Sequence, residues 1–545
     1  MDKLSIRGNK IIFDENTKFL DIEEILKNRF DNLDLNKNID DLYDPYLLPD
    51  MEKAVDRIKK AKENNEKVMI FGDYDVDGVT STSILMHFFK KIGLLASYRL
   101  PNRITDGYGL KNYFIDEIHS LGVTLIITVD CGTKDIEIIK YAKSLGVDVI
   151  VTDHHAVPDE IPKEAIAIIN PKRLDSLYPF SFLAGAGVAF KLMSALAFEF
   201  LEEKEAKEYI TQSIDIAAIG TVADCMPLID ENRVIVTEGL KQIKNTRFLG
   251  IKKLIEDKIH NDLDADLFGF LIGPRLNAAG RLDTPYKAVN LILNNTESVE
   301  KTIEDIENIN NKRKDLTKIF FQDALENIDP NNNIIFYDSD KIEHGIIGIV
   351  AGRITEMFFK PSIVLKKEKD KLVASCRSPE YFSLVEYLEK YKSYFLHFGG
   401  HKQAAGFSIS VDKFEEFKKE FTKKINSIDF SNNIKSLNVD KILNIEEFGF
   451  SLIDKIKKYK PYGIGNLKPV FMFQDFEIEK IEYLGTTKEH ITIKNKYGIS
   501  ILGFGFGEYF DELKGKKTLN IIFDLMEDEW NGKKQLKAKV IDIIN

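Results

Sequence analysis

Residues 71–85, FGDYDVDGVTSTSIL, place three aspartates at alternate positions and then continue with a glycine and a run of small residues. The aspartates are Asp73, Asp75 and Asp77. Carboxylates this close repel one another, and the crowding is tolerable if a cation binds among them. Because the stretch directly follows a short apolar run, it predicts a buried strand that ends at a cation-binding loop.

The pattern around this loop predicts a parallel α/β sheet. Four apolar runs are typical of buried strands, namely VMIF (68–71), VTLIITV (123–129), VDVIVT (147–152) and IAIIN (166–170). Helix-favouring stretches lie between them, over 80–93 and 133–146. Strand, helix and strand at this spacing form right-handed crossovers, which give parallel strands.

Acidic and histidine residues follow two further predicted strands. Asp130 comes directly after the second strand, and Asp153, His154 and His155 follow the third. In open α/β sheets, ligands bind outside the carboxyl ends of the strands. We therefore expect these side chains to meet the three aspartates of the first loop at one rim of the sheet.

One more acid is expected to join them. The segment IDIAAIGTVADCMPL (214–228) begins as a buried helix and carries Asp224 near its end. A lone carboxylate in such apolar surroundings is costly, so Asp224 needs a partner. Carboxylates with one imidazole suit Mn²⁺ or Mg²⁺, and more than four ligands suggest two metal ions. The alternative is that these aspartates only cap the following helices.

A zinc site is a further alternative, because Cys131 and Cys225 directly follow Asp130 and Asp224. Neighbouring residues point in different directions, so we expect both cysteines to pack into the core instead.

Composition limits the class of protein. The 545 residues exceed a single core, and three cysteines give no disulfide framework, which indicates a reducing compartment. We see neither a signal peptide nor an apolar run long enough to span a bilayer, and expect a cytoplasmic protein. A net charge of −11 gives no overall attraction to phosphate polymers. Contact with such a polymer would require bound cations or local basic patches.

The second half of the chain changes pattern twice. Residues 298–328 predict a long connecting helix, and a second α/β unit follows with strands near 333–338 and 361–367 and its end at 397–411. From about 437, short alternating strands with glycine turns predict a small OB-like barrel of roughly five strands.

Two smaller motifs suggest phosphate contacts. In GPRLNAAGRLD, the candidates are Arg275, Asn277 and Arg281, with an interdomain salt-bridge helix as the alternative. Ser375 and Arg377 lie on one face of a predicted strand, which suits a terminal phosphate.

Glycine-rich segments add two more candidates. Arg103 precedes a glycine-rich loop. The pair Gly399–Gly400 can adopt positive φ and expose N–H groups to an anion, with His401 and His397 facing the same space.

The predicted barrel carries aromatic residues that could stack on single strands. They are Phe471, Phe473, Phe476, Tyr483, Phe504, Phe506 and Trp530. Lysines near 532–539 accompany them, and about half of the aromatics must fill the core.

Taken together, DYDVDG, TVDCG, TDHH and GTVADCMPL resemble the four motifs of the DHH phosphoesterase superfamily, and GGHKQAAGF resembles its associated C-terminal domain. The arginine motif and the barrel with PYGIGNLKPVF are similar to the RecJ family of bacterial single-strand-specific 5′→3′ exonucleases.

This resemblance implies a role for each matching residue. The metal ligands would be Asp75, Asp77, Asp130, His154 and Asp224, with Asp130 bridging two Mn²⁺ or Mg²⁺ ions. His155 would contact the scissile phosphate or assist the leaving group. The 5′ phosphate would be held by Arg103, Ser375 and Arg377. His401 would contact a phosphate next to the cut. Asp73 matches the motif without a clear ligand role.

The predicted organisation is an N-terminal segment (1–45), a DHH domain (46–290), a connecting helix (291–330), an associated domain (331–430) and the barrel (437–545). The expected activity is release of 5′-mononucleotides from single-stranded DNA in repair and recombination. Single-strand-binding protein and a RecQ-type helicase are implied partners of an expected monomer. The rivals are a phosphodiesterase for short oligonucleotides or cyclic dinucleotides, and a non-catalytic scaffold.

Overall fold

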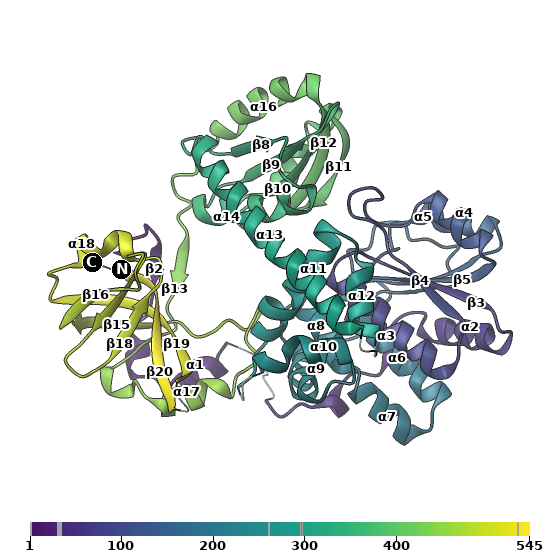
Figure 1. The fold of residues 1–545 in the computed structure, drawn as a ribbon, viewed down its shortest axis with the longest axis horizontal. Coiled ribbons are helices and arrows are strands. Elements are labelled where there is room, and N and C mark those ends of the chain that lie inside the picture. The colour runs from purple at the N-terminus through teal and green to yellow at the C-terminus, as the bar shows by residue number, and fades with distance from the viewer. Residues whose placement is uncertain are drawn as a thin grey trace. The chain divides into compact units, whose positions relative to one another are not determined.

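The computed structural model describes residues 3–29, 35–259, 262–294, 296, 298–530 and 533–544. It divides into two compact units (Figure 1). The larger unit comprises Lys37–Ile428 with Pro461–Asn466, and the smaller comprises Met1–Asn36, Asp429–Lys460 and Leu467–Asn545. Among the described residues, no helix combines the length and apolar character needed to cross a membrane.

The larger unit begins with a five-stranded parallel sheet in the order β4-β3-β5-β6-β7. Four strands confirm the predicted runs: β3 (Lys67–Gly72), β5 (Val123–Val129), β6 (Asp148–Thr152) and β7 (Ala167–Ile169). The fifth, β4 (Ala96–Arg99), was not predicted. It is an edge strand with partly exposed side chains, so it lacks the continuous apolar run of its buried neighbours.

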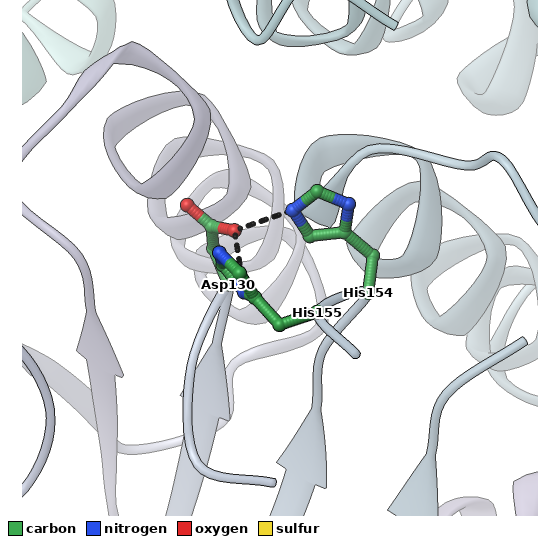
Figure 2. A group of neighbouring side chains, drawn as sticks. All are labelled: Asp130, His154 and His155. Carbon is green, nitrogen blue, oxygen red and sulfur yellow. Dashed lines mark ion pairs between the residues drawn. The ribbon is translucent and has the colours of Figure 1, made fainter. Parts of the chain in front are cut away.

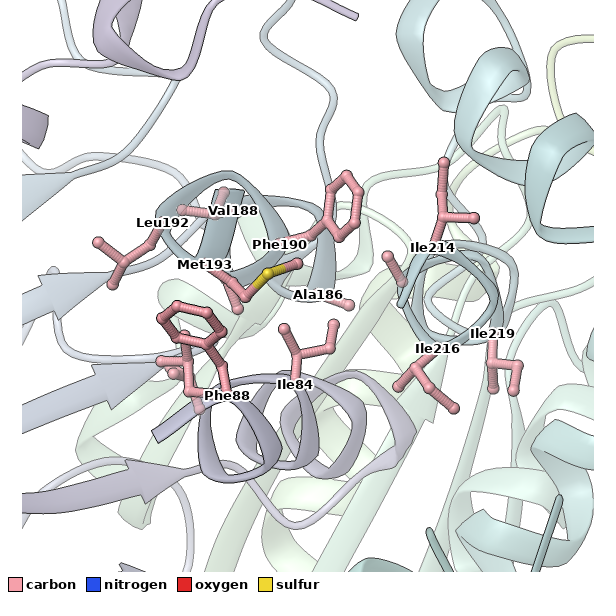
Figure 3. Packing of buried hydrophobic residues seen from close by; sticks show 14 of the residues in the cluster. Ile84, Phe88, Ala186, Val188, Phe190, Leu192, Met193, Ile214, Ile216 and Ile219 are labelled. Carbon is pink, nitrogen blue, oxygen red and sulfur yellow. The ribbon is translucent and has the colours of Figure 1, made fainter. Parts of the chain in front are cut away.

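Three helices of the core pack against one another, α3 (Val76–Ile92), α6 (Gly185–Phe200) and α8 (Ile214–Ala223). Figure 3 shows their apolar side chains meeting, with Ile84 and Phe88 from α3 against Met193 from α6. The small residues after the aspartates permit this approach. A Cβ on Gly220 would lie 2.4 Å from both Thr80 Oγ1 and the Ala186 Cβ, so α8 could come this close only with glycine there.

The other helices of the larger unit's first half surround this core. They are α2 (Met51–Glu63), α4 (Asn112–Ser120), α5 (Ile136–Ser144), α7 (Glu203–Thr211), α9 (Asp230–Gln242), α10 (Leu249–Ile255), α11 (Gly273–Leu282) and α12 (Tyr286–Leu293). A π-helical turn, Leu267–Ile272, leads into α11. The predicted connecting helix is α13 (Val299–Asn327).

The second half of the larger unit contains a five-stranded sheet in the order β11-β12-β10-β9-β8. Its strands are β8 (Ile335–Ser339), β9 (Ser362–Lys367), β10 (Lys371–Arg377), β11 (Phe395–His401) and β12 (Ala404–Ser410). Its helices are α14 (Ile347–Phe358), α15 (Leu384–Glu389) and α16 (Val411–Asn426). Residues 397–411 contribute to the β11–β12 hairpin, and α16 follows within the predicted bounds 331–430 and buries four apolar side chains.

The smaller unit contains a seven-stranded sheet in the order β14-β15-β19-β20-β18-β17-β16. The strands are β14 (Lys441–Ile442), β15 (Phe471–Glu477), β16 (Lys480–Leu484), β17 (His490–Lys494), β18 (Ser500–Gly503), β19 (Thr518–Trp530) and β20 (Lys533–Ile544). Helices α17 (Phe450–Lys457) and α18 (Phe510–Leu513) accompany them. The predicted strands from 470 onward are confirmed, and β14 adds an edge that sequence alone did not indicate.

The N-terminal segment belongs to this smaller unit and not to a separate domain. Strands β1 (Lys3–Leu4) and β2 (Lys10–Ile12) form a three-stranded sheet with β13 (Ser436–Asn438), and α1 (Ile22–Lys27) follows. The first stretch of this compact unit extends to Asn36, whereas the predicted N-terminal segment extends to 45. A segment this short cannot bury a core of its own, so it adds strands to the C-terminal half instead.

The barrel aromatics divide as expected between core and surface. Four are buried, namely Phe471, Phe473, Phe476 and Phe506. Phe504 is 41% exposed, and Tyr483 stacks on Phe510 with ring centroids 4.0 Å apart. The side chain of Trp530 and residue 532 lie outside the described residues.

Candidate metal centre

The loop after β3 holds its aspartates by backbone hydrogen bonds. Asp75 caps α3, because its Oδ1 accepts N–H groups from Asp77 (3.0 Å) and Gly78 (3.2 Å). The capping alternative is therefore correct for Asp75, although it does not prevent the second oxygen from binding a cation. Both oxygens of Asp77 accept N–H groups at 2.7 Å, from Gly185 and Ala186 at the start of α6. Two helix N-termini thus offset the negative charge gathered here.

The side chains after β5 and β6 meet beside this loop. Figure 2 shows one carboxylate oxygen of Asp130 directed towards the rings of both His154 and His155. Asp130 Oδ1 lies 3.2 Å from His154 Nε2 and 3.9 Å from His155 Nδ1. Asp130 has a left-handed backbone, with φ of 60°, which turns its carboxylate towards the rim.

Asp224 completes the group from the end of α8. Its Oδ2 lies 3.5 Å from His154 Nε2, and Asp77 Oδ2 lies 3.7 Å from the same nitrogen. Three sets of potential ligand atoms lie within 4.8 Å of one another: Asp130, His154 and His155; Asp77, His154 and Asp224; and Asp73, Asp75 and Asp130. The predicted convergence of four separated segments is therefore confirmed.

Burial makes these carboxylates expensive to ionise without a cation. Burial and the neighbouring acids raise the pKa of Asp77 to about 7 and that of Asp224 to about 9. The same causes raise the pKa of Asp73 and Asp130 well above the usual range. Burial lowers the pKa of His154 to about 3, so its imidazole is neutral and can act as a ligand.

The donor set fits divalent cations. Within the described part of the chain, buried oxygens of Asp73, Asp130 and Asp224 accept no hydrogen bond, which leaves them available as ligands. Carboxylates with neutral imidazole are the donors that Mn²⁺ and Mg²⁺ bind. Several overlapping sets of ligands accommodate two ions better than one.

His155 has a different environment from His154. Its Nδ1 lies 2.8 Å from Asp153 Oδ1, and Asp153 also accepts the N–H groups of Thr133, His154 and His155. Burial opposes the charge on both residues, but their hydrogen bond prevails, lowering the pKa of Asp153 and raising that of His155. Asp153 therefore orients the His155 ring and leaves its Nε2 free for another partner.

The cysteines give the zinc alternative no support. Among the described residues, no group of potential metal ligands contains a cysteine. Cys131 is buried, with Sγ 3.8 Å from the carbonyl oxygen of Phe71. Cys225 is exposed, so the expectation that it packs into the core was wrong. The sharp left-handed turn at Cys225 (φ 58°), where α8 ends, directs it outwards.

Three arginines gather next to the acids. Burial, together with the charges of Arg103 and Arg377, lowers the pKa of Arg281 to about 9. Arg377 donates to Ser375 Oγ at 3.1 Å, and Arg103 lies 4.0 Å above the Tyr74 ring. We call Arg103, Arg281 and Arg377 the arginine cluster. Because its charges repel one another, an anion bound there would be strongly stabilised.

The other candidates differ in their surroundings. Arg275 donates to Glu307 Oε1 at 2.8 Å and to the Leu271 carbonyl, which is the salt-bridge alternative. Asn277 Oδ1 is buried and, within the described chain, has no hydrogen-bond partner.

His401 and His397 are exposed on β11. Burial and the charges of Lys134, His155 and Lys172 lower the pKa of His401. Gly400 has φ of 155°, and both Gly399 and Gly400 pair within the β11–β12 hairpin.

Sequence reasoning missed one residue of this centre. The hydroxyl of Tyr108 donates to the Asp130 carbonyl at 3.2 Å and lies 3.3 Å from His155 Nδ1. Tyr108 lies in the glycine-rich loop that holds Arg103, and its position between two glycines with positive φ was the available signal.

A parallel sheet whose strand ends gather acids and a DHH motif, joined by a long helix to a second α/β domain, defines the DHH class of phosphoesterases. Residues 67–221 match the DHH family, N-terminal domain, residues 331–427 match the DHHA1 domain, and residues 439–542 match the RecJ OB domain. The chain belongs to the RecJ family.

Several relatives support this assignment. The chain is 31% identical over 537 residues to the single-stranded-DNA-specific exonuclease RecJ of Haemophilus influenzae, covering 93% of this chain and 92% of that protein. It is 34% identical to the protein of the same name from Bacillus subtilis, covering 92% of this chain but only 64% of that longer relative. The crystal structure of RecJ in complex with Mn²⁺ from Thermus thermophilus superposes with a TM-score of 0.80 at 27% identity, covering 91% of this chain and 72% of the other.

The crowded acids make the stability of the metal-free protein depend on pH. An acid whose folded-state pKa is raised keeps its proton when folded but loses it when unfolded. This stabilisation is complete below the unfolded pKa of about 3.9 and is lost as pH rises through about 7 for Asp77 and about 9 for Asp224. In EDTA, we therefore expect the melting temperature to fall as the pH is raised from mildly acidic to mildly alkaline.

Added Mn²⁺ is expected to reverse this trend. Ligation needs deprotonated carboxylates, so binding strengthens with pH. At a free concentration of about one hundred times Kd, one bound ion adds about 2.7 kcal/mol, which should raise the melting temperature of a unit of this size by about 3 °C. Differential scanning calorimetry with EDTA or Mn²⁺ measures both effects. Parallel pH profiles in the two conditions would show that the acids hold no cation.

Proposed function

We propose that this chain hydrolyses single-stranded DNA from the 5′ end and releases 5′-mononucleotides. One observation carries the proposal: the arginine cluster, with Ser375, gathers beside the acidic centre. Burial and the charges of Arg103 and Arg377 lower the pKa of Arg281, and the charge of Asp75 raises it, because these three charged groups lie near its guanidinium. An enzyme with its hydrolytic centre next to a terminal-phosphate pocket would cut near a chain end and not internally.

The reaction breaks the bond between phosphorus and the 3′ oxygen of the first nucleotide. The oxygen of a water molecule forms the new bond to phosphorus, so the shortened strand keeps a 5′ phosphate, and the departing 3′ oxygen gains a proton. Divalent cations bound by the acids would lower the pKa of that water and offset charge on the phosphate oxygens.

Side chains of the protein would hold the cations and supply a proton to the departing 3′ oxygen. Asp77, Asp130, His154 and Asp224 would hold the cations, with Asp73 and Asp75 completing the acidic side. His155, oriented by Asp153, would donate a proton towards the departing oxygen through its free Nε2.

Phosphate contacts would fall to the surrounding polar groups. Ser375 and the arginine cluster would bind the 5′ phosphate, and His401 would contact a phosphate next to the cut. Asn277 is a further contact, whereas Arg275 is proposed to support α11 through its ion pair with Glu307.

The cellular setting proposed is cytoplasmic DNA repair and recombination. A monomer would act with single-strand-binding protein and a RecQ-type helicase, which supply and protect single strands. The barrel would contribute stacking for the strand, through its exposed aromatics such as Phe504.

Digestion of single strands labelled at either end, with Mn²⁺ or Mg²⁺, tests the proposal. Label at the 5′ end should leave first as a mononucleotide, while label at the 3′ end stays on progressively shorter strands. Hydrolysis confined to dinucleotides or cyclic dinucleotides would favour the rival phosphodiesterase. Internal cuts, or release from the 3′ end, would contradict the proposed polarity.

Replacing Arg377 by methionine is expected to remove the preference for a 5′ phosphate. Charged hydrogen bonds to phosphate are lost, so KM for a 5′-phosphorylated strand should rise about 10–100-fold, and KM for a 5′-hydroxyl strand should change little. Steady-state kinetics on the two strands measure the difference. Lys371→Met, which removes an exposed cation from the same strand, is the matched control. An unchanged ratio of the two KM values in Arg377→Met would exclude this phosphate pocket.

A further inference from the structure

A cavity of about 440 Å³ lies in the larger unit beside the acidic centre. Its walls come from the end of α8 and the following turn, the π-helical turn, α11, α13, α14 and a short segment from far along the chain. The volume falls in the range of small-ligand sites, about 300–1,000 Å³. The acids and histidines of the metal centre do not line this cavity, although Asp224 directly precedes Cys225, which does.

The distant segment is residues 461–466, which we call the strap. Ile464 accepts the Leu228 N–H at 2.6 Å through its carbonyl oxygen, and the N–H of Tyr462 donates to Asp264 Oδ1 at 2.9 Å. A Cβ on Gly463 would lie 2.7 Å from the Leu228 side chain, so the strap fits closely only with glycine there. These bonds fix the strap next to the turn that follows Asp224, and the cavity wall is therefore formed in advance of any ligand.

The lining combines apolar walls with cationic groups. Met226, Ile349 and Ile464 provide aliphatic surface, and Phe270 stands 79% exposed on the π-helical turn. Arg281 and Arg313 contribute positive charge against the single carboxylate of Asp266.

This combination matches an unpaired nucleotide. An exposed aromatic ring offers a stacking surface to any base, and guanidinium groups suit the phosphates on either side of it. Asn277 adds a buried amide oxygen that, among the described residues, has no hydrogen-bond partner. A purely apolar ligand would leave this amide and the arginines unsatisfied, whereas the N–H group of a base can donate to the amide oxygen, and base carbonyl and phosphate oxygens can accept from the arginines.

We propose that this cavity, the base pocket, receives one unpaired base next to the cleaved bond, stacked against Phe270. The inference rests on the proposed function, which makes single-stranded DNA the ligand, and adds a site that would distinguish unpaired from paired bases. The edge of a base paired in a duplex already bonds to the partner strand, and its faces stack on neighbouring base pairs. Only an unpaired base can therefore stack on Phe270 and bond to Asn277, so the base pocket favours single strands at the point of hydrolysis. Arg281 belongs both to the arginine cluster and to this lining, which connects the terminal phosphate with the base.

The first test uses strands with one abasic nucleotide moved stepwise from the 5′ end. An abasic residue at one of the nucleotides flanking the cleaved bond should raise KM about tenfold, the scale of one lost stacking contact. Phe270→Ala should raise KM for intact strands by a similar factor. For this variant, moving the abasic nucleotide along the strand should no longer change KM. Phe198→Ala, which removes another exposed ring of the larger unit outside this lining, should behave like the unchanged protein.

Independent effects would overturn the base pocket. If the KM increases caused by the abasic residue and by Phe270→Ala multiply in full when the two changes are combined, the ring and the base do not touch. The same holds if no position near the 5′ end is sensitive to base removal. Circular dichroism melting of both variants verifies that they fold.

The second test uses the exposed thiol of Cys225 as a reporter. N-ethylmaleimide should modify Cys225 while Cys131 and Cys376, which are buried, stay unmodified. A 5′-phosphorylated oligothymidylate with phosphorothioates at its first linkages resists hydrolysis and serves as probe in Mn²⁺. At about ten times its Kd, it should slow Cys225 modification about tenfold, as followed by mass spectrometry. Unchanged modification of Cys225 with the probe bound would overturn the pocket.

The two tests separate this inference from the proposed function. Protection of Cys225 needs only binding, so it reports on the base pocket even if the chain releases no mononucleotides. Absence of mononucleotide release by the unchanged protein would overturn the proposed function alone.

Discussion

Replacing Asp130 by asparagine is expected to lower kcat/KM for single-stranded DNA by about 10⁴-fold or more, at any Mn²⁺ concentration. Asp130 is the acid that belongs to two of the three ligand sets, and its Oδ1 lies 3.2 Å from His154 Nε2. Loss of this carboxylate weakens both cation positions at once. Stabilisation of transition-state charge by metal ions amounts to several kcal/mol, and about 5.5 kcal/mol corresponds to four decades in rate.

Asparagine is the informative substitution because of the backbone at this position. Asp130 has φ of 60°, which asparagine tolerates better than alanine, so Asp130→Asn keeps the fold with less strain than Asp130→Ala. The matched control is Asp159→Asn, an exposed acid in the same domain. Steady-state hydrolysis and thermal melting should be measured together. Robust hydrolysis by a folded Asp130→Asn protein would refute the assignment of the metal ligands.

Replacing His155 by glutamine is expected to lower kcat by about 10²–10⁴-fold, the usual contribution of a positioned proton donor. Glutamine can still donate a hydrogen bond near the position of Nε2, but it cannot give up a proton. His155 is held for this role by Asp153 at 2.8 Å and by Tyr108 at 3.3 Å. Single-turnover rates on a 5′-labelled strand measure the chemical step.

A modified leaving group separates proton donation from other roles of His155. A strand whose first linkage carries sulfur in place of the 3′ oxygen releases a thiolate, which needs little protonation because thiols have a pKa of about 8.5. The deficit of His155→Gln should largely disappear on this substrate, whereas that of Asp130→Asn should remain. An equal deficit of His155→Gln on both substrates would contradict proton donation by this residue.

The catalytic sheet could be predicted because its strands are buried on both faces. Continuous apolar runs such as 123–129 have few alternatives, and the acids after them must gather where parallel strands end. Asp224 was predictable for a different reason, since a carboxylate at the end of an apolar helix needs a partner. Its 3.5 Å distance to His154 confirms that argument.

The features that were missed depend on contacts between distant segments. The edge strand β4 has no strong pattern, and β2 pairs with β13 across more than four hundred residues of chain. The strap (461–466) belongs to the larger unit although its neighbours in sequence belong to the smaller one. The exposed position of Cys225 follows from the left-handed turn after α8, which periodicity does not reveal.

The function of the arginines was only partly predictable from their spacing. Asn277 and Arg281 share a helix face and line the same cavity, as the i, i+4 spacing indicates. Arg275 lies in the same motif but is held by Glu307 of α13, a partner that no local pattern identifies.

The most direct test of the account is anomalous diffraction from crystals grown with Mn²⁺, recorded at the manganese edge. Two peaks about 3.5–4 Å apart are expected, with the Asp130 carboxylate between them and His154 Nε2 bound to one. Such a map would show the crowded acids of residues 73–77 acting as one binding site with Asp224. A map with no peak among these side chains, at saturating Mn²⁺, would contradict it.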